Sequence, residues 1–350
     1  MSASVAAGST GSLRPAILEL TGSEVDAQIL RLGALEHAAA GLVASAAAAA
    51  AASGAPACQL QLCAHLLLPA GAAPGAAADA ALQQPLHSDD GAPAAIACEG
   101  AAHAVRFGLR CFAARQFALV ERALHGRLCA LWEGIPPAVR DGLCFHFILT
   151  VRRDAGCLGT ANPVHADTFD GTMCAFALMS TKAPTPVYPA AAFEPSALAR
   201  FVAEAPGTPG VARPAEVHVQ PASPARPARA GCLLVLPPAV AHSVPNAPHA
   251  IERGAAASEQ GALLSSEGAA RWFCRVSLEV VPAPPATGGS QAGGGGGGGG
   301  AWGQWQREWP GGTDSRRRVA LLAARHVWGD ADFAEQARAA MGLDMAGWGW

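Results

Sequence analysis

Residues 143–151, LCFHFILTV, are an apolar run of the length of a β-strand. Further runs of this kind follow at residues 173–179, 217–219, 231–236 and 272–281, and most are bounded by Gly, Pro, Asn or Asp, which mark turns. Such a series predicts an antiparallel β module, a jelly roll or sandwich, with helices packed outside it. We therefore expect an α+β fold class, mostly β with flanking helices.

Upstream of this series, the sequence predicts two helices and two strands. Residues 25–35 form an amphipathic pattern whose apolar residues are Leu30, Leu32 and Leu35. Residues 113–132 carry apolar side chains at spacings of three and four, as a buried helix does: Phe117, Val120, Leu124, Leu128 and Leu131. Alternating patterns predict strands at the start of residues 58–68 and at residues 105–111.

Composition divides the chain into four regions. Residues 1–104 are an Ala-rich region with one helix and one candidate strand, and residues 105–283 hold the jelly-roll domain with its support helix. Residues 284–312 are a Gly-rich linker, which contains a run of glycines that cannot pack a core. Residues 313–350 are a helical segment that either docks back on the domain or binds a partner.

Charge and hydropathy exclude several classes of partner. The formal net charge of −3 at pH 7 gives no basic surface for nucleic acid. No stretch of about 20 strongly apolar residues predicts a membrane span. The ten cysteines include no Cys-x-x-Cys pair, which favours reduced, mostly buried thiols. We expect a soluble intracellular protein, in the cytoplasm rather than an organelle, although the acid-poor first 18 residues leave a transit peptide open.

Three residues form a candidate metal site. His165 and Asp167 are two apart on an extended segment, so they share one face of a strand. The third is His242, which follows an apolar run and a Pro-marked turn within residues 231–246, GCLLVLPPAVAHSVPN. Two imidazoles and one carboxylate leave three positions of an octahedral ion open, as non-haem Fe(II) oxygenases require.

Two further residues form a candidate carboxylate clamp. Arg275 and Ser277 are two apart on the last predicted strand, so they also share a face. A guanidinium binds a carboxylate by two parallel charge-assisted bonds, and a serine hydroxyl adds a third.

In this order, His-x-Asp, a distal histidine and Arg-x-Ser resemble the Fe(II)/2-oxoglutarate-dependent oxygenase superfamily, over residues 143–281. The resemblance implies a double-stranded β-helix (jelly roll) core, Fe(II) held by His165, Asp167 and His242, and 2-oxoglutarate held by Arg275 with Ser277. It implies a dioxygenase that takes O₂ and 2-oxoglutarate as small-molecule cosubstrates, with ascorbate as a candidate requirement. The products would be succinate, CO₂ and a hydroxylated, unidentified prime substrate.

The identity of Asp167 bears on the reaction within this family. Halogenating members carry a small residue in place of the carboxylate, so the resemblance implies hydroxylation of a C–H bond.

One departure from the family pattern leaves the clamp open to a second interpretation. Members place the carboxylate-binding Arg or Lys closer to the distal histidine than Arg275 lies to His242, and Arg253 is nearer. We prefer Arg275, because residues 247–270 look like a loop insertion and Arg275 has a serine partner on a strand. Arg253 stays the alternative.

Other histidines fit ordinary roles better than metal ligation. A second His-x-Asp, His87 and Asp89, lies in Ala- and Pro-rich sequence and is interpreted as a loop. His249 competes with His242 as the distal ligand, but it follows a proline in a loop. His146 is interpreted as a half-buried strand residue.

The alternative function is a non-catalytic, cupin-like jelly-roll module for binding or regulation.

Overall fold

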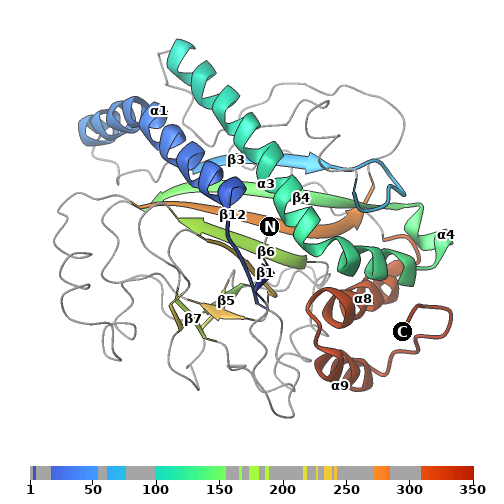
Figure 1. Ribbon diagram of the computed structural model, residues 1–350. Coiled ribbons are helices and arrows are strands. Elements are labelled where there is room, and N and C mark those ends of the chain that lie inside the picture. The colour runs from blue at the N-terminus through green and yellow to red at the C-terminus, as the bar shows by residue number, and fades with distance from the viewer. Residues whose placement is uncertain are drawn as a thin grey trace.

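The computed structural model describes residues 3–4, 17–53, 61–75, 99–154, 165–167, 173–180, 186–188, 216–218, 226–227, 232–238, 240–242, 271–283 and 309–350. Over these residues the protein combines helices with two antiparallel sheets, one of seven strands and one of five (Figure 1). This mixed architecture is compatible with the α+β class that the sequence predicts.

The larger sheet contains most of the predicted strands. In spatial order its strands are β1 (Ala3–Ser4), β2 (Leu18–Leu20), β10 (Leu233–Leu236), β6 (Met173–Ser180), β12 (Arg271–Pro282), β4 (Leu143–Asp154) and β3 (Gln61–Leu67). Every neighbouring pair is antiparallel. The longest ladder joins β12 to β4 from Arg271 opposite Asp154 to Pro282 opposite Leu143. The apolar runs therefore predicted these central strands correctly.

The smaller sheet is built from very short strands. In spatial order they are β8 (Glu216–His218), β5 (His165–Asp167), β11 (Ala241–His242), β7 (Pro186–Tyr188) and β9 (Arg226–Pro227). All four pairings are antiparallel. The strand expected at residues 217–219 is β8, displaced by one residue. Segments of two or three residues are too short to show an apolar period, so β7, β9 and β11 were not predicted.

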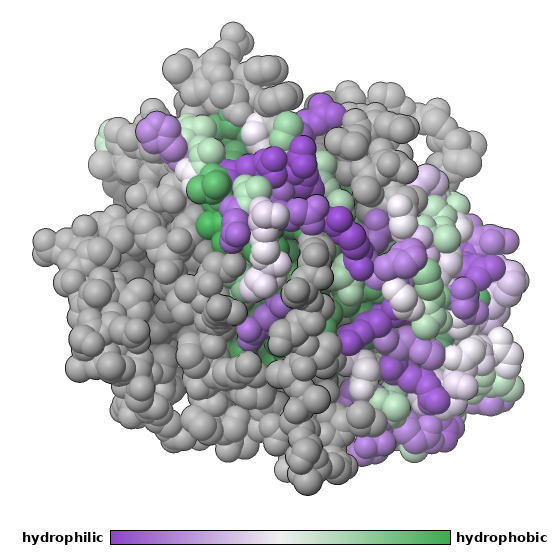
Figure 2. Space-filling view, viewed as in Figure 1, coloured by the Kyte–Doolittle hydropathy of each residue, from purple (hydrophilic) through white to green (hydrophobic). Residues whose placement is uncertain are grey.

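Helices α1 (Ser23–Ser53) and α3 (Glu99–Gly134) lie against each other across one face of the larger sheet (Figure 1). Aromatic side chains join α3 to β4: Trp132 packs on Phe145 at 4.7 Å and Phe117 on Phe147 at 5.4 Å between ring centroids. On the face seen in Figure 2, the coloured surface carries many hydrophilic residues, with smaller hydrophobic areas between them. The main apolar core therefore lies between this face of the sheet and the two helices.

Residues 105–111 are not a strand, so that prediction was wrong: they belong to α3. Val105, Leu109 and Phe112 are buried and lie four and three residues apart. The helical spacing seen from residue 113 onward thus begins earlier, and the local alternation was compatible with both structures.

The amphipathic face of α1 also differs from the prediction. Leu32 and Leu35 are buried together with Val25, whereas the side chain of Leu30 is 75% exposed. At about 100° per residue, a helix turns Leu30 roughly 200° away from Leu32, so the two cannot share one face.

The C-terminal helices dock back on the same core as α3 and the larger sheet. They are α8 (Gly312–Leu322), the π-helical turn η2 (Ala323–Val327) and α9 (Ala331–Met341). The register of β6 with β12 shifts between Leu278 and Glu279, and beside this shift Trp328 Nε1 donates to the carbonyl oxygen of Cys174 at 2.7 Å. That hydrogen bond ties the helices to the sheet.

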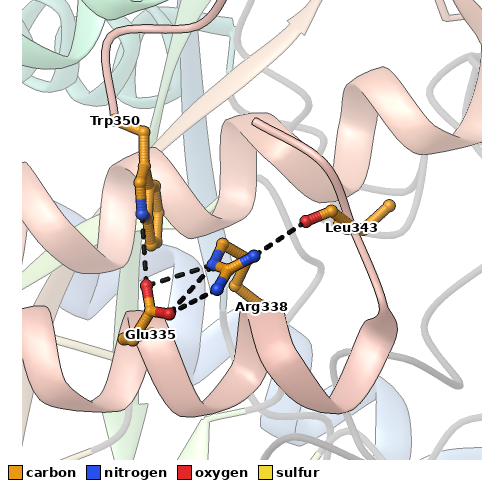
Figure 3. A network of polar contacts seen from close by, with 4 residues as sticks. All are labelled: Glu335, Arg338, Leu343 and Trp350. Carbon is orange, nitrogen blue, oxygen red and sulfur yellow. Dashed lines mark hydrogen bonds and ion pairs between the residues drawn. The ribbon is translucent and has the colours of Figure 1, made fainter. Parts of the chain in front are cut away.

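The last residues of the chain are held against α9 by a polar network (Figure 3). Arg338 donates to the carboxylate of Glu335 and, at 3.3 Å, to the carbonyl oxygen of Leu343. Trp350 Nε1 donates to Glu335 Oε2 at 3.2 Å, and the guanidinium of Arg325 lies 4.8 Å from the centroid of the Trp350 ring. The end of the chain is thus bound to α9 and η2 by these contacts.

The cysteines that the structure describes are present as thiols. No disulfide bond joins the cysteines that the structure describes, and Cys144, Cys174, Cys232 and Cys274 are buried. Burial raises the pKa of the Cys174 and Cys274 thiols. Among the described helices, none combines the length and the apolarity needed to cross a bilayer.

Candidate functional site

The two sheets meet through a small apolar cluster that identifies their inner faces. Val187 of β7 is buried with Leu178 of β6 and with Leu234 and Leu236 of β10. The main core instead holds Ala177, Met179, Leu233 and Val235 from β6 and β10. Because side chains alternate along a strand, the larger sheet turns one face to the helices and the other to the smaller sheet.

The inner face of the larger sheet changes from apolar to polar along the strand order. Arg275 lies directly opposite Leu178, so it shares the inner face, and Ser277 and Glu279 follow it on β12. The inner-face residues on β12, β4 and β3 include Arg275, Ser277, Glu279, Thr150, His146, Cys63 and His65. Antiparallel sheets commonly have one apolar and one polar face, and here the polar face lies on the side of the larger sheet that is turned away from the helices.

The candidate metal ligands occupy neighbouring positions of the smaller sheet. His242 of β11 lies directly opposite Val187 on one side and His165 of β5 on the other. Directly opposite residues of an antiparallel pair share a face, with Cβ atoms about 4.5–5.5 Å apart. Asp167, two residues beyond His165, has the same face. The register thus places the three positions together on the inner face, while ligation itself stays a prediction.

His242 is buried and its ring is oriented by the backbone. Its Nδ1 lies 3.2 Å from the carbonyl oxygen of Val240. With Nδ1 donating to that oxygen, the lone pair of the neutral ring is on Nε2. Metal-binding histidines commonly have this arrangement, because the bond from the second nitrogen selects the tautomer.

Arg275 and Ser277 interact as the sequence pattern suggests. Arg275 Nε donates to Ser277 Oγ at 3.1 Å, and Ser277 is buried. The bond orients the guanidinium on the inner face, and a hydroxyl that accepts one bond can also donate one. The pair has the chemistry to bind a carboxylate, the role that the family resemblance implies.

A second polar cluster on the inner face contains His65, His146 and Glu279. His65 Nδ1 lies 3.2 Å from His146 Nε2, and His146 Nδ1 lies 3.9 Å from Glu279 Oε2. His146 is buried in β4, more deeply than the half-buried position expected from the sequence. Burial, together with the neighbouring His65, lowers the pKa of His146 to about 3. His146 is therefore neutral at physiological pH.

The low pKa of His146 predicts an acid-dependent loss of stability. The unfolded chain takes up this proton near pH 6.5 and the folded chain only near pH 3, so unfolding is favoured as the pH falls between these values. We expect this histidine to contribute a slope of up to about 1.4 kcal/mol per pH unit in that window. Urea titrations from pH 7 to pH 4 should show a shallower slope for His146→Gln.

The matched control for this prediction is Ile148→Val on the same strand. It changes packing without removing a titratable group, so it should lower the free energy of unfolding equally at every pH. A His146→Gln variant with the wild-type slope would contradict the assignment.

The structure also places two residues beside the site that the sequence analysis did not single out. On β8, His218 lies directly opposite His165 and Glu216 lies directly opposite Asp167. The usable signal was the spacing Glu-x-His, the antiparallel mirror of His-x-Asp, in which the glutamate directly precedes the strand predicted at residues 217–219. Only the pairing of β8 with β5 gives that spacing a meaning.

Several predicted residues lie outside the described part of the chain. They are Arg253, His249, His87 and Asp89, and the insertion at residues 247–270 contains the first two. The described side chains contain no group of three metal-ligating residues, and those of His165 and Asp167 are not among them.

We compared the chain with protein-family models, curated proteins and solved structures. The chain matches no protein-family model, no curated protein and no solved structure.

Proposed function

We propose that this protein is an Fe(II)- and 2-oxoglutarate-dependent dioxygenase that hydroxylates a C–H bond. The observation that carries the proposal is the register that sets His242 opposite His165, with Asp167 two residues along the same strand. His165 and His242 lie far apart in the sequence, so their opposite positions are a property of the fold. This register supports one site built from all three.

The strand order supports a double-stranded β-helix as the architecture. The chain alternates between the sheets from β4 to β7 and again from β10 to β12. On the second pass, β12 enters between β4 and β6, and β11 enters between β5 and β7. Two passes of the chain whose strands alternate in this way in both sheets are the topology of a double-stranded β-helix.

The residues fit the groups that this chemistry needs. Two imidazoles and one carboxylate are a suitable donor set for Fe(II), and they would hold the ion from β5 and β11. Arg275 and Ser277, on the inner face of the other sheet, would hold the distal carboxylate of 2-oxoglutarate. A polar site of this kind suits polar ligands such as a metal ion and a carboxylate.

With both groups bound, the reaction couples oxidative decarboxylation to hydroxylation. A bound Fe(II) would serve to activate O₂, so that one oxygen atom would enter succinate, the other would enter the hydroxyl group of the product, and CO₂ would be released. The chain's own contribution is binding and orientation. His242 is held in one tautomer by Val240, and Arg275 is oriented by Ser277, so both are preorganised before ligands bind.

A direct test is succinate formation by the purified full chain. With Fe(II), ascorbate and 2-oxoglutarate, the wild-type protein should form succinate, through uncoupled turnover or with a substrate from a cell extract, and His165→Ala should not. Equal succinate from both proteins would overturn the proposal. If Fe(II) and 2-oxoglutarate also leave the melting temperature unchanged, the protein would instead fit a non-catalytic, cupin-like module.

A further inference from the structure

Strand β8 extends the candidate metal site by one strand. Five residues of metal-binding type occupy two adjacent rows on one face of the smaller sheet: His218, His165 and His242 in one row, and Glu216 and Asp167 in the next. The strand order β8-β5-β11 puts His165 and Asp167 in the middle of this array. The proposed triad uses only three of the five.

Glu216 and Asp167 occupy directly opposite register positions of β8 and β5. Two carboxylates directly opposite on one face of an antiparallel pair repel each other, which destabilises the pair. A cation next to them removes that cost. An array with histidines in the adjacent row is therefore easier to explain beside a bound metal ion than on a solvated strand.

Metal ligands need partners of their own. A ligating histidine almost always donates its second ring N–H to a carboxylate, carbonyl or similar acceptor, and a ligating carboxylate is itself hydrogen-bonded. Val240 provides such a partner for His242. His218 and Glu216 occupy the register positions beside the other two ligands, His165 and Asp167.

We infer that Glu216 and His218 are positioning residues of the metal centre, which orient His165 and Asp167 and raise their affinity for a divalent ion. This inference rests on the proposed function, because it presupposes a metal ion at the triad. It goes beyond that function by assigning β8, an edge strand outside the His-x-Asp motif, to the site.

The simplest competing explanation is a structural one. Edge strands often carry charged residues that prevent association with other chains. In that case the two residues would affect solubility but not the affinity of the triad for a metal ion, so affinity separates the two explanations.

The experiment is a calorimetric titration of the metal-free full chain with Co(II), without 2-oxoglutarate or substrate. We expect one ion per wild-type chain, and a dissociation constant about 10- to 100-fold higher for Glu216→Gln and for His218→Ala with the stoichiometry unchanged. Glu216→Asp, which keeps the carboxylate, should restore affinity toward the wild-type value. Val217→Ala, on the same strand but the opposite face, is the matched control and should bind as the wild type does.

Four outcomes would overturn the inference. If both variants bind Co(II) as tightly as Val217→Ala does, β8 has no part in the centre, although the proposed function survives. If Glu216→Gln, His218→Ala and Val217→Ala lose affinity equally, the strand acts only through folding. If the wild type binds two ions and the variants one, the residues are direct ligands of a second ion; if it binds none, the proposed function fails as well.

Discussion

A His242→Ala variant should lose metal binding and succinate formation together. Loss of a residue that only orients a ligand already costs about 10- to 100-fold in metal affinity, so loss of a ligand should cost more than about 100-fold. The expectation follows from the register that pairs His242 with His165 and from the hydrogen bond that orients its ring. Co(II) titration and the succinate assay on the same preparation measure both effects.

The control for this variant is His249→Ala, because His249 competes as the distal ligand in the sequence. It should retain both metal binding and activity. If His249→Ala loses them and His242→Ala keeps them, the distal ligand has been assigned to the wrong histidine. Circular dichroism of the metal-free variants confirms that each has folded.

An Arg275→Ala variant should bind 2-oxoglutarate far more weakly. Truncating one partner of a desolvated, hydrogen-bonded charge pair costs about 2–5 kcal/mol. That cost corresponds to roughly a 30-fold to several-thousand-fold increase in the KM for 2-oxoglutarate. Metal affinity without 2-oxoglutarate should change little, because Arg275 lies on the other sheet from the triad.

Arg253→Ala is the informative comparison, because Arg253 is the alternative clamp. We expect its KM for 2-oxoglutarate to match the wild type. The reverse pattern, with Arg253→Ala impaired and Arg275→Ala normal, would transfer the role to Arg253. Ser277→Ala should give an intermediate effect, since it removes the acceptor at 3.1 Å that orients the guanidinium but keeps the charge.

The central strands of the larger sheet could be predicted because each carries its own local signal. The run at residues 143–151 becomes β4, and the run at residues 272–281 becomes β12, with Phe145 and Val276 buried toward the helices. The same locality explains the error at residues 105–111. Over so short a window, an alternating pattern and a helical one share several apolar positions, and the rest of α3 decided between them.

The sequence by itself determined which residues have the chemistry for a site: His165, Asp167 and His242 as ligands, and Arg275 with Ser277 as a clamp. It also determined the sharing of faces within one strand, because side chains alternate with a period of two. Adjacency between strands depends on register, which is set by cooperative pairing across long stretches of chain and not by any local spacing.

Only the tertiary structure decided that His165 lies opposite His242 and that β8 brings Glu216 and His218 to the same face. It also decided that the polar inner face of the larger sheet includes His65 and His146, which are far apart in sequence and 3.2 Å apart between their ring nitrogens. The physical reason is the same in each case. Hydrogen-bonded pairing of distant strands brings together side chains whose chemistry the sequence shows only one at a time.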